Sequence, residues 1–238
     1  EEVAYRQPSE WLDRNQAKVV LYAHGGLNSE EDSIARIRIL GPYFKANGMY
    51  PIFFTWTTGF LESLKYIIGD VALGIEPQGA WRDIWKGVTD VAKEANDRAI
   101  EVACQNVLVK AVWSQMKQNA EASASSENAA LQPTVECIKN LQRAHNNLEI
   151  HLIGHSAGSI LLGYLLGLFG ESIRVTTCTL YAPACTVWFA LDHYQPAIKN
   201  GVLDKSALTF EILTDEREQA DSVGPYGKSL LYLVSRAL

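Results

Sequence analysis

The chain has 238 residues, of which 47% are apolar and 20% are charged, and its formal net charge is −6. These values are typical of a folded globular protein with one large domain, and they exclude a disordered chain. The negative charge argues against nucleic acid or an anionic membrane surface as the main partner.

Cysteine usage and hydropathy narrow the class of protein further. Cys104, Cys137, Cys178 and Cys185 show no metal-type spacing, which predicts reduced thiols in a cytoplasmic protein. The longest apolar window, residues 61–75, is interrupted by charged residues and glycines, so we expect no integral membrane segment. We expect no metal and no organic cofactor.

The first half of the chain opens with a strand, a helix and a second strand. We assign no element to residues 1–17, and then predict a buried strand over 17–23, a helix over 29–48 and a buried strand over 50–56. Elements of these types and lengths form a βαβ unit, which implies a parallel sheet.

About ninety residues then pass before the next strand, which is far more than one crossover helix requires. Residues 133–144 have the pattern of that crossover helix, and residues 122–128 that of a surface loop. The rest is helical in pattern and rich in aromatic residues. We interpret residues 57–130, approximately, as a helical cap over the functional face of the sheet; a purely structural helical layer is the alternative.

The segment 149–162 is the centre of the functional prediction. An apolar run of strand length leads into Gly154-His155-Ser156-Ala157-Gly158, and an apolar run of helical length follows at once. This is a G-x-S-x-G pattern in a strand–turn–helix context, which predicts a strained turn that exposes the serine hydroxyl as a nucleophile. Gly154 and Gly158 leave room for the backbone to approach itself. The alternative is a glycine-rich turn of another α/β fold. A phosphate loop is disfavoured because no Gly-Lys-Ser/Thr follows.

A second glycine motif lies at the end of the first predicted strand. His24-Gly25-Gly26-Leu27 can direct backbone N–H groups at the serine, with Ala157 N–H as the other donor of an oxyanion hole. Gly26 or Leu27 is the expected first donor, and the sequence does not separate them. The alternative is a simple tight turn between strand and helix.

The remaining pattern completes one α/β domain over residues 1–238, without internal repeats. We predict a buried helix over 159–169, a strand over 174–181, a helical excursion to residue 200, a strand over 207–213, a charged loop over 214–224 and a final amphipathic helix over 229–238.

Through these two motifs and the strand order, the chain resembles an α/β-hydrolase fold serine hydrolase of the lipase and esterase type, from residue 17 to about residue 238. The resemblance implies a mostly parallel sheet flanked by helices and a catalytic order of Ser, Asp, His. The implied acid is Asp221, with Asp215 as the alternative; the one not used would be a solvated surface carboxylate.

The base departs from the family pattern, because no histidine follows His193. The resemblance implies a histidine one strand beyond residue 238. The alternatives are that His193 is the base or that the protein has lost turnover. His155 follows the strand that precedes the serine, and we expect the turn to direct its side chain away from the hydroxyl.

The sequence thus predicts a serine hydrolase that cleaves a carboxylic ester or related acyl bond through an acyl-enzyme on Ser156. The aromatic insertion favours an apolar, lipid-like acyl substrate. The alternative is a catalytically silent scaffold that binds a ligand or a partner protein. The sequence makes no prediction about oligomeric state.

Overall fold

The structure is a computed structural model that describes residues 2–25, 30–55, 94–95, 97–98, 100–102, 109–125, 129, 131–223 and 226–237. The chain folds into two compact units. The first comprises Glu1–Thr57 and Lys117–Ile212, and the second comprises Thr58–Met116 and Leu213–Leu238. The predicted cap falls largely on residues outside the described ranges.

The first unit is built on a five-stranded, all-parallel sheet with the strand order β2-β1-β3-β4-β5. The strands are β1 (Lys18–Ala23), β2 (Tyr50–Phe54), β3 (Glu149–His155), β4 (Thr177–Tyr181) and β5 (Leu208–Glu211). The predicted α/β class and parallel sheet are therefore confirmed. The last two strands are shorter than predicted, because Val175 forms only an isolated bridge with Leu203 and the chain leaves the sheet after Glu211.

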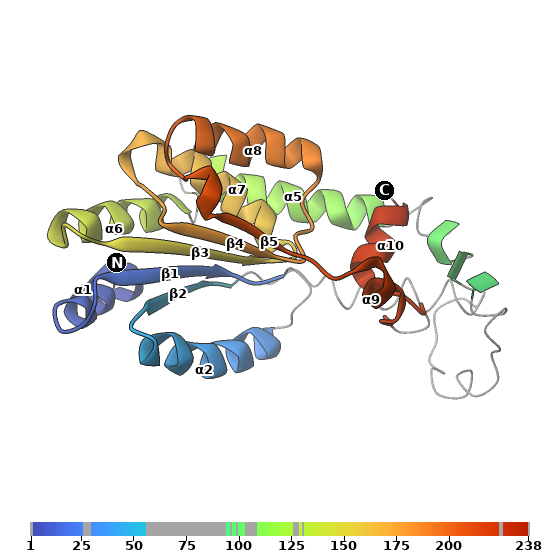
Figure 1. The fold of residues 1–238 in the computed structure, drawn as a ribbon, viewed down its shortest axis with the longest axis horizontal. Coiled ribbons are helices and arrows are strands. Elements are labelled where there is room, and N and C mark those ends of the chain that lie inside the picture. The colour runs from blue at the N-terminus through green and yellow to red at the C-terminus, as the bar shows by residue number, and fades with distance from the viewer. Residues whose placement is uncertain are drawn as a thin grey trace. The chain divides into compact units, whose positions relative to one another are not determined.

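Helices cover both faces of this sheet (Figure 1). One face carries α6 (Leu131–Ala144), α7 (Gly158–Phe169) and α8 (Val187–Lys199), and the other carries α2 (Glu30–Ala46). Short helical segments η3 (Gly170–Ser172) and η4 (Lys205–Ala207) lie before β4 and β5. Parallel sheets need this two-sided cover, because both of their faces are usually apolar.

The core follows from the alternation of side chains along the strands. Leu21, Leu152 and Leu180 point to the α7 face and are fully buried. Val20 and Tyr22 point to the α2 face and pack there with Phe44 of α2 and Phe53 of β2. The apolar sequence of α7 is explained by its place against the middle of the sheet, where nine of its residues are buried.

Two regions are more helical than the sequence predicts. Residues 2–12 form η1 (Glu2–Arg6) and α1 (Gln7–Leu12), because Trp11 packs against Tyr50 with ring centroids 5.8 Å apart and Leu12 is buried. These partners are distant in sequence, so local patterning does not reveal them. The expected loop over 122–128 is wrong at its start, since α5 (Val109–Ser125) continues to Ser125 with Ala120 and Ala124 buried one turn apart.

The second unit contains α9 (Asp215–Gln219) and α10 (Leu230–Ala237). Helix α9 corrects the prediction of a continuous loop over 214–224: the Thr214 hydroxyl caps it by accepting the Arg217 N–H. Helix α10 confirms the predicted C-terminal helix. Within this unit, the Tyr226 hydroxyl donates to Glu101 at 3.0 Å, which ties the segment before α10 to residues 100–102.

Candidate functional site

Ser156 occupies the turn between β3 and α7, at the carboxyl end of the central strand. Its φ of +51° lies in the left-handed region, which costs a residue other than glycine about 1–3 kcal/mol unless its surroundings impose it. Those surroundings belong to the turn after β4: the Ser156 N–H donates to Tyr181 O at 2.9 Å, and Ser156 O accepts the Ala184 N–H at 3.2 Å. The neighbouring strand therefore holds the serine in its strained conformation.

The flanking glycines allow this turn to pack against the sheet. A Cβ on Gly158 would lie 2.1 Å from Ala23 O, and a Cβ on Gly154 would lie 2.9 Å from Leu162 Cδ1 and 3.3 Å from the Gly158 carbonyl carbon. No side chain fits at position 158 without moving backbone. Close approach therefore requires a glycine at position 158, and at position 154 a side chain would crowd Leu162, Leu180 and the backbone of the turn.

The strand order supplies an independent reason to place a site here. Strand β1 is flanked by β2 on one side and β3 on the other, so the chain reverses its direction of travel across the sheet between β1 and β3. Open parallel sheets bind ligands beyond the carboxyl ends of the strands at such a switch point. Gly25 after β1 and Ser156 after β3 lie at this place.

The loop after β1 lies against the serine, as the sequence predicts. A Cβ on Gly25 would lie 3.1 Å from Ser156 Cβ and 3.1 Å from His155 Nδ1, although more than 120 residues separate these positions in sequence. Gly26 and Leu27, the expected first oxyanion donors, lie outside the described residues. Ala157 is 1% exposed, and its N–H has no acceptor in the described part of the chain. A buried N–H without a partner is rare, and it is available to a ligand oxygen.

Two histidines lie beneath this loop, on the α2 face of the sheet. The buried His24 ring pairs through Nδ1 with Gly25 O at 2.7 Å and through Nε2 with Ser33 Oγ at 3.1 Å. Burial lowers the pKa of both His24 and His155, with smaller contributions from the Arg36 charge. Both imidazoles are consequently neutral at pH 7. The buried Nδ1 of His155 has no hydrogen-bond partner among the residues that the structure describes.

The predicted base and acids each have other partners among the described residues. The His193 ring stacks on Phe189 at a centroid distance of 4.1 Å and meets Tyr164 edge-on, and no hydrogen bond joins it to Ser156. Asp215 lies in the first turn of α9, where it accepts from Gln219, and Asp221 accepts the Ser222 N–H. Both aspartates belong to the second unit, so their predicted role as the acid stays a prediction.

Two features of the site have no counterpart in the sequence analysis. Ser159 donates to Ser156 O at 2.7 Å and accepts the Cys185 N–H at 3.2 Å, so it ties the Ser156 turn to the loop after β4. The signal in the sequence that could have pointed to this link is a serine three residues after Ser156. Ala182 also has a positive φ, +42°, and only a glycine at this position would have signalled it.

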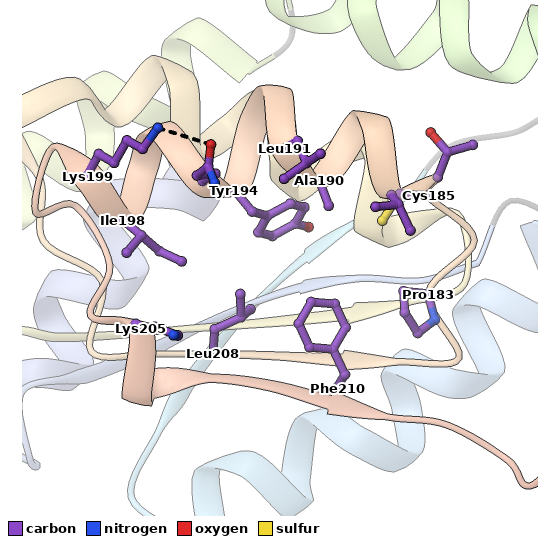
Figure 2. A pocket seen from close by; sticks show the side chains of 13 residues that line it. Pro183, Cys185, Ala190, Leu191, Tyr194, Ile198, Lys199, Lys205, Leu208 and Phe210 are labelled. Atoms are coloured by element: carbon purple, nitrogen blue, oxygen red, sulfur yellow. Dashed lines mark hydrogen bonds between the residues drawn. The ribbon is translucent and has the colours of Figure 1, made fainter.

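A groove of about 750 Å³ lies between α8 and β5 (Figure 2). Its floor is formed by Leu208 and Phe210, and Tyr194 and Ile198 of α8 point toward them. Pro183 and Cys185 form the end nearest the serine turn, and Lys199 and Lys205 form the other end. The groove is thus mainly apolar.

Among the described residues, no group of three or more His, Cys, Asp or Glu side chains is arranged to hold a metal ion. Cys137 and Cys178 are both buried, and burial raises the pKa of Cys178 to about 12, so the Cys178 thiol is not a nucleophile. No helix within the described ranges has the length and apolar character needed to cross a bilayer.

The chain was also compared with known proteins: no family model matches it, and no match was found among curated proteins. The functional conclusion therefore depends on the geometry of the site.

Proposed function

We propose that this protein is a serine hydrolase of the α/β-hydrolase type, in which Ser156 attacks the carbonyl carbon of an ester or related acyl bond. The observation that carries the proposal is Ser156 itself, a residue other than glycine held at φ +51° between a parallel strand and a buried helix. Strain of this kind persists where function requires it, and a nucleophile elbow is the known use of this turn.

The surroundings of the serine support the same chemistry. Attack on a carbonyl places negative charge on its oxygen, which must be met by fixed N–H groups. The Ala157 N–H, buried and without an acceptor in the described chain, is one such donor. Gly25, whose absent side chain lets the loop after β1 approach Ser156, directly precedes Gly26 and Leu27, from which the other donor is proposed to come.

The proposed reaction proceeds through an acyl-enzyme. The Ser156 hydroxyl loses its proton to a base and attacks the carbonyl carbon, the alcohol leaves with that proton, and water then releases the acid. The substrate is proposed to carry an apolar acyl group. Asp221 or Asp215 is proposed as the orienting acid and a histidine as the base.

A specific observation favours a second candidate, the catalytically silent scaffold. Within the described ranges, no histidine hydrogen-bonds to the Ser156 hydroxyl, and the His193 ring is occupied by its aromatic neighbours. A serine without a base is a poor nucleophile at neutral pH. This candidate keeps the site as a ligand-binding crevice without turnover.

Hydrolysis of p-nitrophenyl esters, from acetate to octanoate, separates the two candidates. If the protein is a hydrolase, we expect hydrolysis that Ser156→Ala abolishes. Ser206→Ala is the control and should leave hydrolysis unchanged, because Ser206 is an exposed serine that bonds to Asp204. A parent protein no faster than its Ser156→Ala variant on every ester would favour the scaffold and overturn the proposed hydrolase.

A further inference from the structure

We propose that β5 and α8 form the interface of a homodimer, in which a second copy of this chain docks around a two-fold axis. Strand β5 would pair antiparallel with β5 of the other copy, and the two α8 helices would lie antiparallel over the join. This inference is independent of the proposed function, and its occupant is the chain itself.

The first observation is the contrast between the two edges of the sheet. Strand β2 contains Pro51, which cannot donate to a further strand, and its Tyr50 is covered by Trp11 and the Lys45 ammonium. Among the described residues of the first unit, no further strand pairs with β5, and β5 contains no proline. Glu211 O accepts the Ala182 N–H, so by alternation the Phe210 N–H and C=O point away from β4. An unprotected edge of this kind is a template for strand pairing.

The second observation is a concentration of exposed apolar side chains beside this edge. Val187 is 75% exposed, Trp188 77%, Phe210 48% and Ile212 73%, and Leu191 is exposed as well. Val187, Leu191 and Phe210 line the apolar groove between α8 and β5, which Figure 2 shows open beside Phe210, and Trp188 and Ile212 are close to them in sequence. Contiguous apolar surface of this extent marks an interaction site rather than a solvated face.

The third observation is charge, and it points to a second copy as the partner. Trp188, Asp192, Gln195 and Lys199 are spaced at 4, 3 and 4 residues, so they form one stripe along α8, and all four are exposed. Asp192 lies toward the start of this stripe, and Lys199 lies at its end. The Lys199 ammonium bonds to Gln195 and, in the described chain, to no carboxylate; Asp192 likewise has no ion-pair partner there.

A two-fold axis would place the acidic part of each α8 stripe against the basic part of the other. When two α8 helices run antiparallel, Asp192 of each copy faces Lys199 of the other, which gives two equivalent ion pairs. On the same face of the sheet, Leu208 and Phe210 of the two copies meet under both helices and close the groove. The surface formed by β5 and α8 would therefore provide strand pairing, burial of apolar side chains and two ion pairs in the same interface.

The test is the mass of the full chain in solution, measured by sedimentation equilibrium between about 1 and 100 μM. The parent is expected to be a dimer. Leu191→Glu should be a monomer, while Ile39→Glu, the same change at a 72% exposed site on α2, should remain a dimer. Circular dichroism checks that each variant is folded. A monomeric parent at 100 μM, or a folded Leu191→Glu dimer, would overturn the inference.

A charge exchange tests the antiparallel arrangement and does not depend on an apolar change. Lys199→Glu should weaken dimerisation about tenfold, because it replaces two attractive contacts by two repulsive ones. Asp192→Lys combined with Lys199→Glu should restore the parent dissociation constant. A double variant as weak as the single one would contradict the proposed pairing, and a dimer unaffected by either would place the interface elsewhere.

Discussion

The turns that follow β3 and β4 are alike in backbone and different in what they can do. Ser156 and Ala182 both have positive φ, +51° and +42°, and both end neighbouring parallel strands at the same edge of the sheet. They are also linked, since Ser156 N–H donates to Tyr181 O. Ser156, however, has a hydroxyl and faces the loop of Gly25, whereas Ala182 donates its N–H to Glu211 O and has no reactive group. Backbone strain is common to both turns. Under the proposed function, the side chain and its neighbours decide which of the two turns carries the reaction.

The largest effect is expected when the serine is moved from the turn after β3 to the turn after β4. Ser156→Ala should lower ester hydrolysis by about 10⁴-fold or more, because the covalent step is lost. Adding Ala182→Ser should restore nothing, since that turn lacks the oxyanion loop. Initial rates on a p-nitrophenyl ester measure both variants. Recovery of activity in the double variant would mean that strain alone is sufficient.

The next largest effect is expected at the glycine that lets the serine turn approach the sheet. Gly158→Ala should destabilise the fold by about 3 kcal/mol, because the new Cβ would lie 2.1 Å from Ala23 O. Gly167→Ala in the same helix is the matched control, since no atom lies within 4 Å of its Cβ position, and it should stabilise by about 0.5–1 kcal/mol. Urea unfolding midpoints compare the two. Equal midpoints would contradict the close approach.

The stability of the fold should depend on pH, because the buried His24 and the partly buried His155 lie beside the serine turn. Burial lowers the pKa of His24 in the folded chain, so the unfolded chain binds a proton that the folded chain resists. Stability is therefore full above about pH 6.5 and falls as the pH drops below it, by at most about 1.4 kcal/mol per pH unit for this group.

The variant His24→Gln isolates that contribution. Urea unfolding from pH 7.5 to 5 should show a shallower loss of stability in the variant than in the parent. His151 and His193, whose pKa values are also lowered, contribute equally to both proteins, and only the smaller effect of His24 on the pKa of His155 is lost together with His24. Parallel curves would show that His24 does not carry the dependence.

The smallest expected effect tests whether the two turns are equally strained. Ala182→Gly and Ser156→Gly should each stabilise the fold by about 0.5–1 kcal/mol, since left-handed strain of about 1–2 kcal/mol is partly offset by the greater freedom of glycine in the unfolded chain. Thermal unfolding measures both. A gain in stability at one turn and a loss at the other would show that the two turns are not equally strained.

The sequence predicted those parts of the molecule that local pattern controls. Apolar runs of the right length identified the strands and α7, and Gly154 and Gly158 identified the turn because close approach admits no side chain there. The pairing of the loop at Gly25 with Ser156 followed from the parallel sheet, which brings strand ends to one edge.

The parts that were missed depend on contacts between distant residues or on competing signals. Helix α1 exists through the packing of Trp11 on Tyr50, which no window of sequence contains. Helix α9 has a cap at Thr214, yet its charged residues resemble those of a solvated loop. The positive φ of Ala182 is imposed by its neighbours and leaves no trace in residue type. The exposed apolar side chains beside β5 were equally invisible, because exposure is a property of the folded chain.

The most direct measurement for the central claim is to locate a covalent adduct. A fluorophosphonate mimics an acyl substrate and phosphonylates a serine only where that serine is activated next to an oxyanion hole. After reaction at neutral pH, peptide mass spectrometry should find the added group on Ser156 and on no other serine. Denatured protein should not react. An unlabelled native protein, or an adduct spread over surface serines with Ser156 unmodified, would contradict the account.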